Sequence, residues 1–146
     1  MFKLYFGFCL TFLWNTVFAQ TENFPESWTD LLKTDQVSIS YKLQDCGLQS
    51  SGIHNEYIIL KINNLTDTNL QLNWLQQVNY GDNKSLNLVN SEQLKSIELP
   101  ANEVIEGECT KNWGNNLRIF VRSKAEIGPK KSLLSFDLTN LNIAVL

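Results

Sequence analysis

The sequence is poor in the residues from which most catalytic and metal sites are built. It has one histidine, His54, and three cysteines in 146 residues, with no Cys-x-x-Cys pair. A single histidine leaves few ways to assemble a base and a nucleophile, or a zinc centre. Basic residues are also few, since 12 lysines and arginines stand against 15 acidic residues. Nucleic-acid binding depends on clustered basic side chains, so we expect no nucleic-acid partner.

The chain also lacks an apolar run long enough to span a bilayer, which takes about 20 residues. Its main apolar run, residues 4–14, follows Lys3 and precedes Val17-Phe18-Ala19, which has the small residues of a signal-peptidase site. We therefore expect residues 1–19 to be a secretory signal peptide. The mature chain, from Gln20, would then be periplasmic or extracellular and have no membrane span. The residues before Cys9 lack the leucine of a lipobox, which argues against a lipoprotein.

Loss of the signal peptide would remove Cys9 and leave Cys46 and Cys109. An even pair of cysteines in an oxidising compartment predicts a disulfide. Such a bond would close a long loop and stabilise the fold by about 2–4 kcal/mol, mainly by restricting the unfolded chain. A dithiol redox site or a metal site is the alternative, and the lone histidine gives it little support.

Apolar and polar residues alternate over most of the chain after residue 36. Val37, Ile39, Tyr41 and Leu43 are separated by polar residues, as in a strand with one buried face. We expect further strands at residues 57–63, 70–80, 94–99, 104–109, 117–121 and 133–146. Seven or so short strands without a helical period predict an all-β domain over residues 37–146, an antiparallel β-sandwich of immunoglobulin-like type. A barrel or a jelly roll is the alternative.

Local features refine this expectation. In the N-terminal segment, residues 20–36, Pro25 and acidic residues precede apolar ones, which predicts a short helical turn. The turn residues of 64–69 predict a hairpin between the strands on either side. The apolar face is interrupted near Leu75-Gln76 and changes parity at Thr139-Asn140, and each irregularity predicts a β-bulge.

Few residues suggest catalysis. His54 lies in a loop with nearby serines but without the spacing of a nucleophile elbow, so we expect an exposed loop histidine. Glu103, Glu106 and Glu108 are candidates for a calcium site or an acid/base pair. No loop motif surrounds them, and a charged edge strand is the simpler interpretation. We expect no catalytic residue, no metal and no cofactor, and hence no enzyme.

Aromatic residues supply the main suggestion of a ligand. Trp74 lies on the apolar face of its strand and is expected in the core. Trp113 stands in a polar turn, residues 112–116, where an exposed ring would favour ligand binding. The candidate ligand contacts are therefore Trp113 and Tyr80, with Trp28 as a further aromatic that a sugar-binding surface would use.

Two turn segments match the acceptor pattern for N-glycosylation. They are Asn64-Leu65-Thr66 and Asn83-Lys84-Ser85. Such matches arise by chance in a chain rich in asparagine, and they matter only if the source is a eukaryote.

Several of these features occur together in one group of proteins. The signal peptide, Cys46, the strand of residues 56–64, the Trp74 strand and the segment from Leu99 to Cys109 resemble small secreted β-sandwich proteins of unassigned function from flavobacteria-type Gram-negative bacteria. The resemblance covers roughly residues 37–146. It implies a periplasmic or surface location, and it carries no catalytic residue across.

The sequence as a whole favours a non-enzymatic, secreted or periplasmic binding or accessory module with an unknown protein or glycan partner. A carbohydrate-binding module is one alternative, and a hydrolase that uses its surface carboxylates is another. In a third interpretation the terminal strand, residues 141–146, is an exposed edge that pairs with a partner chain.

Overall fold

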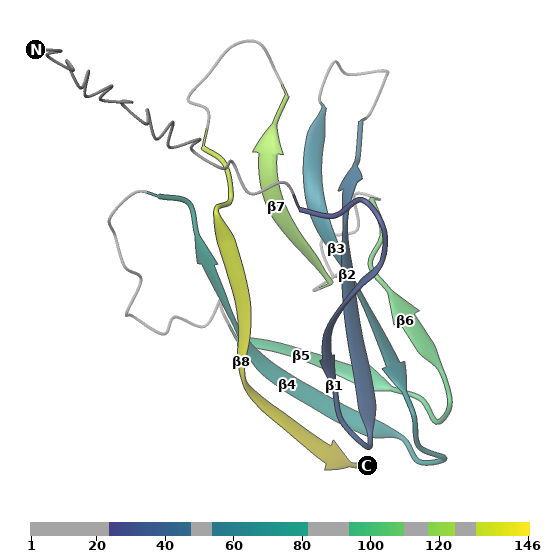
Figure 1. Cartoon of the computed structure of the whole chain (residues 1–146). Helices are drawn as coiled ribbons and strands as arrows, with labels where there is room; N and C mark the ends of the chain where they lie inside the picture. Colours follow the sequence, from purple (N-terminus) through teal and green to yellow (C-terminus); the bar gives the residue numbers. More distant parts are fainter. Residues whose placement is uncertain (1–23, 48–53, 82–93, 110–116, 125–130) are drawn as a thin grey trace, which may run out of the picture.

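In a computed structural model the chain forms two antiparallel β-sheets (Figure 1). The structure describes residues 24–47, 54–81, 94–109, 117–124 and 131–146. Within these ranges no helix occurs, so none is present that could cross a membrane. The strands are β1 (Thr29–Lys33), β2 (Val37–Asp45), β3 (Asn55–Asn64), β4 (Leu70–Asn79), β5 (Leu94–Leu99), β6 (Val104–Glu106), β7 (Arg118–Ser123) and β8 (Ser135–Val145).

The first sheet has the order β1-β2-β3, and both β6 and β7 pair along the free edge of β3. Gly107, between those two strands, donates its N–H to the carbonyl oxygen of Leu60 at 2.9 Å, and the Leu60 N–H is bonded to the carbonyl oxygen of Leu117 at 2.8 Å. A Cβ atom at Gly107 would collide with the Leu117 carbonyl. Glycine is therefore needed where β6 and β7 share the edge. The second sheet has the order β5-β4-β8.

The core lies between the two sheets, as the alternating pattern predicts. Tyr41 of β2 packs edge-on against Phe136 of β8, with ring centroids 5.2 Å apart, so the sheets meet face to face. Trp74 is 1% exposed, which confirms its expected place in the core. The all-β, sandwich-like architecture is confirmed. Its buried cluster comprises Val37, Ile39, Ile58, Leu60, Ile62, Leu70, Leu72, Trp74, Leu99, Leu117, Ile119, Val121 and Leu133.

The hairpin predicted at residues 64–69 is wrong. β3 and β4 lie in different sheets, so residues 64–69 form a crossover. Asn64, 2% exposed, holds it: its Nδ2 donates to the carbonyl oxygens of Thr68, Leu99 and Pro100 at 2.8, 3.1 and 3.0 Å. Its Oδ1 accepts from the N–H and the hydroxyl of Thr66 at 2.9 and 2.8 Å. Turn residues favour either type of connection, because they do not specify which sheet the next strand joins.

Over residues 24–36, the part of the N-terminal segment that the structure describes, the expected helical turn is not found and β1 lies in its place. β1 pairs with β2. Just before it, the carbonyl oxygen of Pro25 accepts the N–H of Leu43 at 2.7 Å, so this segment is bound to the edge of β2. Phe24 packs against Phe136, with centroids 6.0 Å apart. These tertiary contacts outweigh the weak local signal for a helix start.

The bulge predicted at Thr139-Asn140 is confirmed. Asn73 pairs with Asn142, but Leu75 pairs with Thr139, so β8 has one extra residue in this stretch. Asn140 has a φ of 52°, in the left-handed region that asparagine tolerates better than most residues. The bulge predicted near Leu75-Gln76 is wrong: the extra residue lies in β8, and β4 keeps a regular register with β5 through Leu75.

Candidate functional site

The outer face of the first sheet, which points away from the core, carries a polar groove. Residues of β2 alternate between the two faces of the sheet, and the outward positions next to β3 are occupied by Ser38 and Ser40. Serine side chains are short and the side chains that surround Ser38 and Ser40 are larger, so the surface is hollow above the two serines. The resulting groove, here called the Trp28 groove, has a volume of about 360 Å³ and is lined by Trp28, Asp30, Ser38, Ser40, Lys61, Asn63 and Val104.

The register of the sheet arranges these side chains in two rows across four strands. Paired residues point to the same face about 5 Å apart, so each row is set by backbone pairing. The first row, from β1 to β6, is Asp30, Ser40, Lys61 and Glu106. The second row, from β1 to β6, is Lys33, Ser38, Asn63 and Val104.

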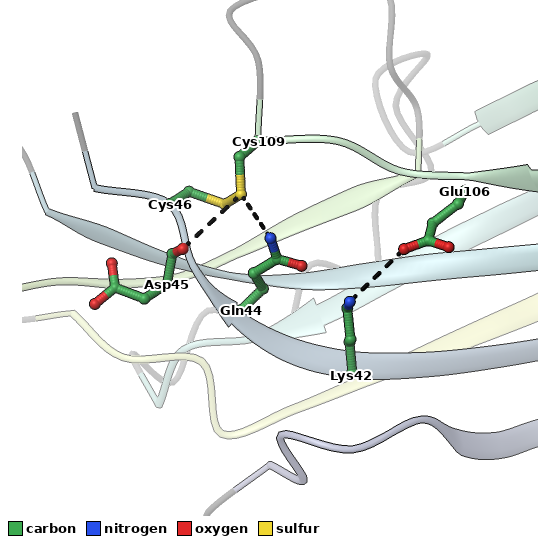
Figure 2. The surroundings of a disulfide bond; sticks show 6 residues. All are labelled: Lys42, Gln44, Asp45, Cys46, Glu106 and Cys109. Atoms are coloured by element: carbon green, nitrogen blue, oxygen red, sulfur yellow. Dashed lines mark hydrogen bonds and ion pairs between the residues drawn. A yellow bond between two sulfur atoms is a disulfide. The ribbon is translucent and has the colours of Figure 1, made fainter.

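Trp28 forms one wall of the groove. The chain before β1 loops across β2 (Figure 1) and brings the indole ring over two lysines of the outer face. The Nζ atoms of Lys61 and Lys42 lie 4.0 and 4.6 Å from the ring centroid. Lys42 is also 3.6 Å from a carboxylate oxygen of Glu106 (Figure 2). Cation–π contacts of this kind contribute about 0.5–1 kcal/mol each at exposed sites, so the two lysines hold the ring in place.

The floor of the groove offers uncommitted polar groups. The side chains of Ser38, Ser40 and Asn63 form no hydrogen bond with other residues of the described ranges. On the far side, Val104 is 54% exposed and adds apolar surface opposite Trp28. The groove thus combines hydrogen-bonding groups with apolar walls, the mixture that small-molecule sites use for orientation and affinity.

The aromatic residues singled out from the sequence have different places. Tyr80 is half-buried and donates its hydroxyl to the carbonyl oxygen of Phe120 at 2.7 Å, which ties the end of β4 to β7 across the two sheets. Burial raises the pKa of this hydroxyl. Trp113 lies outside the described residues. Of the two candidates that the structure describes, Trp28 is the one that lines the groove.

The predicted disulfide between Cys46 and Cys109 is present (Figure 2). It joins the chain after β2 to the chain after β6, with Cα atoms 5.2 Å apart. Gln44 donates its side-chain amide to the Sγ of Cys109 at 3.4 Å. The bond therefore links two strands that pair with opposite edges of β3.

The candidate acidic residues do not gather into a site. Glu106 pairs with Lys42, while Glu103 and Glu108 are exposed. The carbonyl oxygen of Glu103 accepts the N–H of Asn64 at 2.9 Å, which is a backbone role. Over the described ranges, no group of three or more His, Cys, Asp or Glu side chains is placed to hold a metal ion.

A set of four charged side chains at the disulfide end of β3 has a structural role. Glu56 has a side chain 7% exposed and binds both Arg122 and Lys124, the latter at 2.8 Å. Lys124 also binds Asp45 at 2.9 Å. Burial raises the pKa of Glu56, but hydrogen bonds from Lys124 and Arg122 outweigh it and leave that pKa below its ordinary value. The two carboxylates, Glu56 and Asp45, are thus balanced by the two cations, Arg122 and Lys124. His54 lies nearby and is exposed, as expected.

Sequence reasoning did not find the Trp28 groove. The available signal was the pair of serines at outward positions of β2, beside Asn63 of the next strand. The position of Trp28 depends on tertiary contacts of the chain before β1, and no local pattern predicts it. No family model, curated protein or solved structure matches this chain.

Proposed function

We propose that this protein is a non-enzymatic binding module that acts in the periplasm or outside the cell, with the Trp28 groove as its ligand site. One observation carries the proposal: an aromatic wall stands beside three polar side chains that have no partner in the described structure. The disulfide supports an oxidising compartment. The signal peptide at residues 1–19, the immunoglobulin-like form of the sandwich and the kinship with secreted flavobacteria-type proteins belong to the same proposal.

The groove favours a saccharide as the ligand. Sugar rings present C–H groups that suit apolar walls such as Trp28 and Val104, and hydroxyls that suit short polar groups such as Ser38. In this carbohydrate-binding module Trp28 takes the place first assigned to Trp113 and Tyr80. A hydrolase is not favoured, because Glu106 is already paired with Lys42 and none of the three candidate glutamates lines the Trp28 groove.

The proposal is tested by native affinity electrophoresis of the mature protein, residues 20–146, with its disulfide oxidised. The gels contain a neutral β-glucan, a polyuronate or a sulfated polysaccharide. We expect at least one of them to retard the wild type, and Trp28→Ala to abolish the retardation. Tyr57→Ala is the matched control, because Tyr57 lies on the same outer face but packs against Phe120, outside the groove. Migration unaffected by every polysaccharide, or equal retardation of Trp28→Ala and wild type, refutes the proposal.

A further inference from the structure

The charges around the Trp28 groove are unevenly paired. Glu106 is directly opposite Lys61 in the sheet register, yet its carboxylate forms an ion pair with Lys42 at 3.6 Å. Among the described residues Lys61 forms no ion pair, and its Nζ lies 4.0 Å from the centroid of the Trp28 ring. A ring contact uses the charge of the ammonium group but leaves hydrogen-bond donors free.

We propose that the groove binds an acidic saccharide, a hexuronate whose ring carboxylate is bound by the ammonium group of Lys61. This inference rests on the proposed function and names its ligand class. In this arrangement the ring lies between the Trp28 and Val104 walls, and its hydroxyls reach the serines and Asn63 on the floor.

Asp30 sets the orientation of the ligand. It lines the groove from β1, and two strand spacings, about 10 Å, separate its backbone from that of Lys61. A carboxylate accepts hydrogen bonds from sugar hydroxyls but repels another carboxylate. The acidic group of the ligand is therefore directed to the Lys61 end.

A uronate suits these charges better than a neutral or a highly charged sugar. A neutral sugar would leave the Lys61 ammonium without a charged partner, whereas hydrogen bonds between two ionised groups are about twice as strong as neutral ones. A heavily sulfated chain would place several anions beside Asp30 and Glu106. Lys61 is the one cation among the residues that line the groove, and it matches one carboxylate per ring.

The test is isothermal titration calorimetry on the mature protein with trimers of galacturonate, mannuronate and glucuronate, and with the methyl esters of the same trimers. The ester keeps the ring and its hydroxyls but removes the charge. We expect at least one acid to bind about tenfold more tightly than its ester. Lys61→Gln should remove that difference, and Trp28→Ala should weaken both ligands. Lys95→Gln, which removes the same charge from β5 of the second sheet, is the matched control and should bind as the wild type does.

Equal affinity for acid and ester, or equal loss of both in Lys61→Gln, would overturn the inference and leave a saccharide site in place. A second result would also overturn the inference: none of the three acids binds, but another polysaccharide still retards the protein in a gel. The proposed function would then stand. The proposed function fails on a different result: no polysaccharide retards the wild type in the gel, or Trp28→Ala is retarded as much as the wild type.

Discussion

Replacement of Asn64 by alanine should destabilise the protein more than any other single change of a polar side chain that we consider. The side chain is 2% exposed and makes five hydrogen-bond contacts, three from Nδ2 and two to Oδ1. The three carbonyl oxygens share two N–H donors, so roughly four full bonds are lost. At about 1 kcal/mol for each bond, Asn64→Ala should lower the free energy of unfolding by about 3–4 kcal/mol. That is a large part of the 5–15 kcal/mol that stabilises a typical domain.

The measurement is urea denaturation followed by tryptophan fluorescence, with Asn63→Ala as the matched control. Asn63 is the next residue of the same strand, but its side chain points to the outer face, so its removal should change stability by less than about 0.5 kcal/mol. Asn64→Asp should be less stable than Asn64→Ala at neutral pH, because it places a charge against carbonyl oxygens, and acidification should restore stability. A loss below about 1 kcal/mol in Asn64→Ala would refute the view that this side chain holds the crossover.

Three further changes test other parts of the fold. Replacement of both Cys46 and Cys109 by serine should lower the free energy of unfolding by about 2–4 kcal/mol, measured in urea without reductant, and an unchanged midpoint would contradict the role given to the bond. The lowered pKa of Glu56 means that its pairs stabilise the protein above the ordinary value of 4.5 and that this contribution is lost as the pH falls through the folded-state pKa. Glu56→Gln should therefore show a weaker loss of melting temperature on acidification than wild type, and an equally steep loss would contradict this. Asn140→Val should cost about 1–2 kcal/mol by calorimetry because φ is positive there, whereas Asn140→Gly should be close to neutral.

The parts of the fold that follow from local alternation were predictable, and the parts that depend on sheet partners were not. A change of parity at Thr139-Asn140 has one simple geometric meaning, so the bulge of β8 could be located in the sequence. Residues 64–69 carry no comparable information, since the same turn residues serve a hairpin or a crossover. β1 was missed because its five residues contain Leu31 and Leu32 side by side, which breaks the alternation expected of a strand.

The same division explains the site. The disulfide was predictable from the number of cysteines and their compartment, without any knowledge of the sheet. The Trp28 groove requires that Ser40 lies between Asp30 and Lys61, and that the ring of Trp28 folds back over the sheet. These relations involve β1, β2 and β3 together. Register between strands is not recorded in the pattern of any one strand, so the sequence pointed first to Trp113 and Tyr80 and named Trp28 only as a further aromatic.

The position of the groove on the sheet also affects the entropic cost of binding a ligand there. Asn63 of the floor precedes the buried Asn64, and Val104 of the wall follows Glu103, whose carbonyl oxygen accepts the N–H of Asn64 at 2.9 Å. The opposite end of the β2 and β3 pair is held by the disulfide and by the charges around Glu56. Floor residues on strands held at both ends lose little conformational entropy when a ligand is bound. Trp28 lies outside the strands and is held by two lysines, so ligand contact with Lys61 would act directly on the position of the ring.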